Sequence, residues 1–132
     1  MNTSRISKKA NAFCLALVLT VFCFISIWWA YHLPMSSAPD EHMRLQVPLF
    51  IAENGYLPRG DDPSIINETW GTSYAFSVYG SSLIAVPFIC AAKLLVPNSA
   101  AMLVFAARVS NCLLAVLNVF CIYLIGKKLN LG

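Results

Sequence analysis

Two long apolar blocks, separated by a stretch that holds every acidic residue, dominate the pattern of the chain. Residues 11–33 contain no Asp, Glu, Lys or Arg, and residues 99–126 contain a single charged residue, Arg108. At about 1.5 Å per helical residue, each block exceeds the ~30 Å of hydrocarbon in a bilayer. The pattern predicts transmembrane helices at 11–33 and 99–126 in an all-α integral membrane protein.

Basic residues at the two ends of the chain indicate its orientation. They precede the first block and follow the last: Arg5, Lys8, Lys9, Lys127 and Lys128. Because basic flanks favour the cytoplasm, residues 1–10 and 127–132 are predicted to be cytoplasmic and residues 34–75 extracytoplasmic. We therefore expect a multi-pass protein of the cell membrane with both termini inside.

The first block has one alternative interpretation, a cleaved signal peptide. Small residues at Ser36-Ser37-Ala38 would suit a signal peptidase. Against cleavage, the apolar core is longer than the usual ~7–15 residues, and the bond after Ala38 leads into Pro39. A retained membrane anchor is the better prediction.

A third apolar segment, residues 76–96, lies between the two blocks. It is interrupted by Gly80 and Pro87 and carries Lys93 near its end. If this segment crossed the membrane, the C-terminal lysines would fall outside. We expect a juxtamembrane or half-inserted helix at 76–96, with three crossings as the alternative.

The acidic stretch at 34–75 is expected to contain a second juxtamembrane helix, at 40–54. Asp40 suits the N-cap, Glu41 favours the positive start of a helix, and Asn54-Gly55 is a C-terminal stop. Asp61 and Asp62 follow within a Pro/Gly-rich run of turns. Their carboxylates are either solvated or available to a divalent cation.

Composition agrees with a membrane protein and narrows the chemistry. Hydrophobic residues make up 58% of the chain and charged residues 11%, against about a quarter charged in soluble domains. All five cysteines lie in apolar segments and none is in the acidic loop, which argues against a disulfide framework. The lipid bilayer is the expected partner, and no nucleic acid is expected.

The candidate chemistry lies in the run Asp40-Glu41-His42, with Arg44 at ion-pairing distance from Asp40 on a helix. One carboxylate of the pair could face a reaction cavity as a base. The simpler interpretation is that Asp40 caps the helix, Glu41 sits in water, and Arg44 pairs with Asp40 or with lipid phosphate.

Arg108 is the second candidate, because an unpaired charge inside a membrane helix costs roughly 2.5–3.5 kcal/mol. Asn111, Ala115 and Asn118 continue its face of the helix. This stripe should face protein or a cavity. Either Arg108 meets a phosphate or carboxylate, or it snorkels while the asparagines hold helices together.

Three stretches carry a family resemblance: PDEHMRLQVPLFIAENGYLPRGDD after the first block, the aromatic TWGTSYAF, and AARVSNCLLAVLNVFCIYLIGKKL near the end. Their order resembles the N-terminal portion of bacterial GT-C superfamily glycosyltransferases related to protein O-mannosyltransferases and lipid A aminoarabinose transferases. The resemblance covers nearly the whole chain from residue 11.

The resemblance implies an enzyme that moves a sugar from a polyprenyl-phosphate donor to an envelope acceptor at the outer face. The catalytic base of such enzymes maps to Asp40, with Glu41 beside it. Arg44 and Arg108 are candidates to offset charge on the departing phosphate, a role that a divalent cation could share, and His42 is grouped with them as a binding residue.

Members of that family have many more helices than two. The 132 residues are therefore expected to be inactive alone and to need further membrane helices or subunits. The competing function is a non-catalytic small membrane protein or accessory subunit of envelope assembly. A third is a transporter fragment with Arg108 on the substrate path.

Overall fold

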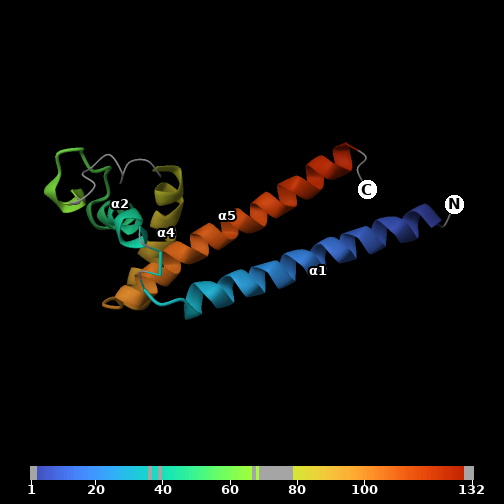
Figure 1. Cartoon of the computed structure of the whole chain (residues 1–132), viewed down its shortest axis with the longest axis horizontal. Helices are drawn as coiled ribbons and strands as arrows, with labels where there is room; N and C mark the ends of the chain where they lie inside the picture. The colour runs from blue at the N-terminus through green and yellow to red at the C-terminus, as the bar shows by residue number, and fades with distance from the viewer. Residues whose placement is uncertain (1–2, 36, 39, 67, 69–78, 130–132) are drawn as a thin grey trace. The chain divides into compact units, whose positions relative to one another are not determined.

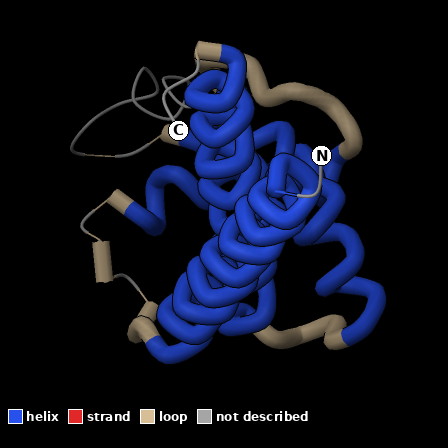
Figure 2. Tube along the Cα trace, turned by 90° about the vertical axis from the view of Figure 1, so that its right-hand side faces the viewer, coloured by secondary structure: helices blue, strands red, loops and turns tan. Residues whose placement is uncertain are grey.

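The computed structural model describes residues 3–35, 37–38, 40–66, 68 and 79–129, and within these ranges the chain is helical with no strand (Figures 1 and 2). The predicted all-α class is confirmed. The aromatic stretch TWGTSYAF lies outside the described residues. The elements in chain order are α1 (Thr3–His32), α2 (Glu41–Asn54), the short 3-10 helix η1 (Pro63–Ile65), α4 (Tyr79–Leu95) and α5 (Ala100–Lys128).

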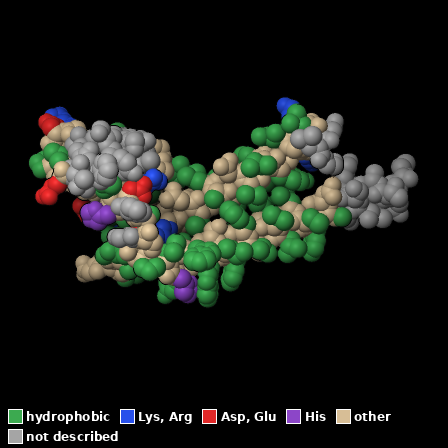
Figure 3. All heavy atoms as spheres, viewed as in Figure 1, with side chains coloured by type: hydrophobic (Ala, Val, Ile, Leu, Met, Phe, Trp, Pro, Cys, Tyr) green, Lys and Arg blue, Asp and Glu red, His purple; other side chains and the backbone are tan. Residues whose placement is uncertain are grey.

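Two of these helices, α1 and α5, are long and apolar enough to cross a membrane. The apolar part of α1 covers Ala10–His32, 23 residues, and α5 has 29. Large hydrophobic side chains on both helices are exposed, among them Phe13 at 69% and Ile122 at 66%. Figure 3 shows such side chains along both helices. Apolar exposure on this scale is typical of a surface covered by lipid or protein.

Contacts divide the chain into two compact units, Met1–Trp29 with Cys112–Gly132, and Ala30–Asn111. The second unit, called the Ala30–Asn111 unit below, contains the core. In it α2 packs against α4 and η1. Ala85 and Ile89 of α4 form a buried cluster with Ala107 of α5. Four partly buried side chains pack against this cluster: Leu45, Leu49, Ala52 and Leu103.

The ends of α2 follow from its sequence. The helix begins at Glu41 and ends at Asn54, within one residue of the predicted range. Gly55 adopts the left-handed conformation (φ 74°), and its N–H donates to the Ile51 carbonyl at 2.8 Å. Glycine takes this conformation without the steric cost of a Cβ atom. The predicted stop at Asn54-Gly55 is confirmed.

The described part of α4 has 17 residues, a rise of about 25 Å at about 1.5 Å per residue. That length is below the ~30 Å of a bilayer's hydrocarbon. One face of α4 is buried through Ala85, Ile89 and Ala92, whereas Leu94 and Leu95 are 84% and 78% exposed. The segment is therefore a helix with one side packed on protein and an apolar end that is open.

Candidate functional site

The acidic pair lies at a cavity of about 330 Å³ inside the Ala30–Asn111 unit. Its volume is at the small end of the range for small-molecule sites. Apolar residues of α2, α4 and α5 form much of the wall. The polar lining residues are Asp40, Glu41, Arg44, Ser81, Ser82, Arg108 and Asn111. The fold thus brings the acidic pair and both candidate arginines to one cavity.

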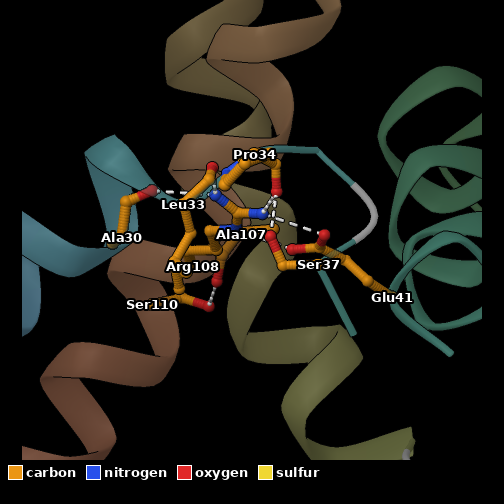
Figure 4. Close-up of polar contacts among 8 residues, drawn as sticks. All are labelled: Ala30, Leu33, Pro34, Ser37, Glu41, Ala107, Arg108 and Ser110. Carbon is orange, nitrogen blue, oxygen red and sulfur yellow. Dashed lines mark hydrogen bonds and ion pairs between the residues drawn. The ribbon is translucent and has the colours of Figure 1, made fainter. Parts of the chain in front are cut away.

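Arg108 donates five hydrogen bonds within the site, to groups that surround its guanidinium (Figure 4). Its Nε donates to Glu41 Oε1 at 2.6 Å, and its Nη2 donates to Glu41 Oε2 at 2.9 Å. Its Nη1 donates to the carbonyls of Ala30 at 3.0 Å and Leu33 at 2.7 Å, and its Nη2 also donates to the Pro34 carbonyl at 2.9 Å. A guanidinium has five N–H donors, and here each has an acceptor.

These acceptors lie where α1 ends and α2 begins: the Ala30 carbonyl in the last turn of α1, the Leu33 and Pro34 carbonyls just after it, and the carboxylate of Glu41. The last carbonyls of a helix lack an intrahelical donor and carry partial negative charge, so a cation at the end of α1 is favourable. Glu41 is in the first turn of α2, where an anion is favourable. Arg108 therefore joins the last turn of α1, the start of α2 and the body of α5.

Burial makes the Glu41–Arg108 pair structurally important. The two side chains are only 16% and 15% exposed. Removing one partner of a fully buried pair costs about 3–5 kcal/mol, and this partly buried pair is expected to cost less than that upper value. The interpretation that Glu41 sits in water is wrong, because Arg108 reaches it from α5. In this arrangement Arg108 has no donor left for a phosphate.

Asp40 and Arg44 form a second ion pair, which is open to solvent. Arg44 Nε donates to Asp40 Oδ2 at 2.7 Å, and an Nη nitrogen meets the same oxygen at 2.5 Å. The Arg44 side chain is 55% exposed and that of Asp40 is 24% exposed. The predicted pairing four residues apart is confirmed.

The prediction that the Asp40 side chain caps α2 is wrong. Asp40 occupies the N-cap position of α2, but its side chain makes no capping hydrogen bond. Arg44, one helical turn later, takes the carboxylate instead, because residues four apart face each other on a helix. The Asp40 carboxylate therefore faces Arg44 along the surface of α2, and both residues line the cavity.

The remaining predicted residues lie away from the cavity lining. His42 is exposed, and it is not one of the lining residues. Asp62 caps η1: its Oδ1 accepts from Ser64 N at 3.0 Å and Ser64 Oγ at 2.6 Å. These hydrogen bonds lower the pKa of Asp62 below its ordinary value. No group of three or more His, Cys, Asp and Glu residues in the described ranges is placed to hold a metal ion.

Some members of the site were not assigned to it from the sequence. Ser81, Ser82 and Asn111 are polar residues in apolar segments, and only the packing of α2 against α4 and α5 brings them to the acidic pair. Lys93 likewise pairs with Glu53 of α2, Nζ to Oε1 at 2.9 Å, across 40 residues of chain. Sequence spacing carries no signal for contacts of this kind.

No protein-family model, curated protein or solved structure matches the chain. The resemblance to GT-C glycosyltransferases therefore rests on the three stretches quoted above. The geometry of the site is an independent basis for considering its chemistry.

Proposed function

We propose that this chain is the N-terminal portion of a membrane glycosyltransferase that transfers a sugar from a polyprenyl-phosphate donor to an envelope acceptor at the outer face of the cell membrane. The observation that carries the proposal is the solvent-reachable pair of Asp40 and Arg44 at a cavity of about 330 Å³. A carboxylate base and a cation for phosphate are the two groups that such a transfer needs at one place.

The membrane topology in this proposal has two crossings. In it α1 and α5 span the bilayer, both termini are cytoplasmic, and residues 34–75 are extracytoplasmic. The supporting observations are the length and hydropathy of α1 and α5 and the basic residues at both chain ends. The described part of α4 has one face packed on protein through Ala85, Ile89 and Ala92, which is compatible with a position along the interface.

In the proposed reaction Asp40 is the general base. It removes the proton of the acceptor hydroxyl as that oxygen bonds to the anomeric carbon of the sugar. The bond from the anomeric carbon to the phosphate oxygen breaks, and the lipid phosphate leaves with the electron pair. Arg44 offsets the charge on that phosphate. General base catalysis of this kind contributes typically about 10²–10⁴-fold.

Glu41 has a different role in this proposal from the catalytic one first assigned to it. Both of its carboxylate oxygens accept hydrogen bonds from Arg108, and its side chain is 16% exposed. A base must reach its substrate proton, so the more exposed Asp40 fits that task better. Glu41 and Arg108 then hold the first turn of α2 in place and thereby position Asp40.

The decisive experiment compares Asp40→Asn with Asp61→Asn, each introduced into the native gene. Transfer of radiolabelled sugar from a polyprenyl-phosphate-linked donor to envelope material is measured in membranes of the cells that express the altered gene. Asp40→Asn is expected to lower transfer about 10²–10⁴-fold at equal protein abundance, because it removes the base. Asp61→Asn, in an exposed turn away from the cavity, is expected to leave transfer unchanged.

Unchanged sugar transfer in Asp40→Asn would refute the proposal that Asp40 is the catalytic base. In that case the non-catalytic function, an accessory subunit of envelope assembly, becomes the better account. The pairing of both acids with arginines within one unit is compatible with that function, because ion pairs also serve structure.

A further inference from the structure

We infer that Arg44 is a reversible mask of Asp40. When the lipid-linked donor binds, the Arg44 guanidinium leaves the Asp40 carboxylate and pairs with the phosphate group of the donor. Donor binding would then uncover the base. This inference rests on the proposed function for its biological meaning, but the exchange itself is a binding event that does not require turnover.

The first step of the argument is that the base is occupied in the structure without donor. Arg44 places Nε and an Nη nitrogen on the same oxygen of Asp40, at 2.7 and 2.5 Å. A carboxylate oxygen engaged by two guanidinium nitrogens is a poor acceptor for a further proton. Both contacts are to Oδ2, and pairing with a cation makes a carboxylate a weaker base, so departure of Arg44 would make Asp40 a stronger one.

The second step is that this pair is inexpensive to open. Arg44 is 55% exposed and Asp40 is 24% exposed, and exposed pairs contribute typically about 0.2–1 kcal/mol. The guanidinium fork is also well matched to phosphate oxygens, with which it forms two parallel hydrogen bonds. A phosphate entering the cavity therefore competes effectively for Arg44.

The third step is that the neighbouring arginine cannot substitute in this exchange. Arg108 uses all five donors within the protein, and its side chain is only 15% exposed. Moving it would expose the last carbonyls near α1 and leave the Glu41 charge buried. The two arginines at the cavity are therefore distinguished by their bonding, one fixed and one exchangeable.

The fourth step is that the cavity has room and polar groups beside Arg44. Ser81, Ser82 and Asn111 line the same space of about 330 Å³. Hydroxyl and amide groups are common ligands of phosphate oxygens and sugar hydroxyls. An anion that meets Arg44 at this position would lie beside Asp40, where the acceptor proton has to be removed.

The test uses the 132-residue chain in detergent micelles and a water-soluble geranyl phosphate as the probe. Binding is followed by the NMR signal of the Arg44 Nε–H group. Wild type should show a saturable shift of this signal, whereas the Arg108 Nε–H signal should stay in place. Arg44→Gln should abolish saturable binding, and Arg59→Gln, in an exposed loop, should not change it.

Asp40→Asn gives the sharpest result, because it removes the competitor for Arg44. We expect geranyl phosphate to bind about 1.4- to five-fold tighter in this variant, the range that an exposed ion pair of about 0.2–1 kcal/mol allows. Adding Asp40→Asn to Arg44→Gln should not restore saturable binding, because the guanidinium that meets the phosphate is still missing. Saturable binding in the double variant would mean that Asp40 acts only by charge repulsion and would overturn the exchange.

The outcomes separate this inference from the proposed function. If Arg44→Gln leaves geranyl phosphate binding intact, the mask is refuted, even if Asp40→Asn abolishes sugar transfer. If the exchange occurs as expected but sugar transfer does not depend on Asp40, the site exchanges phosphate for a purpose other than glycosyl transfer. Inorganic phosphate in place of geranyl phosphate shows whether the prenyl chain adds affinity; equal affinities would assign the site to phosphate alone.

Discussion

The ion pairs Asp40–Arg44 and Glu41–Arg108 begin at adjacent residues, yet they differ in solvent exposure, in the separation of the partners along the chain and in the other hydrogen bonds of the arginine. The first joins residues four apart on one helix and is open to water. The second joins residues 67 apart on α2 and α5, is largely buried, and belongs to a guanidinium with no spare donor. The comparison shows that two carboxylate–guanidinium pairs at one cavity can differ in exposure and in the segments that they join, and exposure decides which pair a ligand can compete with.

The largest effect is expected from Arg108→Met. This change leaves the partly buried Glu41 carboxylate without its ion pair and removes one donor from each of three carbonyls, of which that of Pro34 also accepts from Ser37 Oγ. The free energy of unfolding should therefore fall by more than about 1 kcal/mol and by no more than about 3–5 kcal/mol. The matched variant Arg44→Met should lose about 0–1 kcal/mol, because its pair is exposed. Unfolding of the chain in micelles, followed by circular dichroism, measures both. Similar losses would break the comparison.

A smaller effect on stability is expected from the pair Glu53–Lys93. This pair tests whether burial or the joining of two helices explains the difference in strength between Asp40–Arg44 and Glu41–Arg108. This pair joins α2 to α4 across 40 residues, but its side chains are 61% and 30% exposed. If burial decides strength, a double-mutant cycle with Glu53→Gln and Lys93→Met should give a coupling of about 0.2–1 kcal/mol that falls with added salt. A coupling as large as that of Glu41–Arg108 would show that joining two helices, and not burial, is what matters.

The smallest effect is expected at Asp62, a carboxylate held by neutral donors. Hydrogen bonds from Ser64 lower its pKa below the ordinary value of 3.8. Its folded pKa is below its unfolded pKa, so its contribution to stability is present above the unfolded pKa and is lost as pH falls through the folded pKa. NMR titration should show the Asp62 pKa rising toward its ordinary value in Ser64→Ala. An unchanged pKa in that variant would exclude the Ser64 hydroxyl as the main cause, because the Ser64 N–H remains as a donor.

Local features of this protein could be predicted from the sequence because they depend on spacing of a few residues. The apolar blocks became α1 and α5, since a run of apolar residues long enough to span hydrocarbon is visible without any fold. The end of α2 at Asn54 followed from Gly55, and the Asp40–Arg44 pair followed from the four-residue spacing of a helix. Each of these predictions used contacts within about one helical turn.

Contacts between distant segments were decided only by the tertiary structure. The sequence marked Arg108 as an anomaly, but nothing in its neighbourhood indicated that Glu41 and the carbonyls of Ala30, Leu33 and Pro34 would surround it. The adjacent acids looked equivalent in the sequence, but packing gives Glu41 a partner on α5 and leaves Asp40 paired with Arg44 one turn along. The physical reason is that pairing depends on distance through space, which helix packing sets, whereas the sequence fixes only distance along the chain.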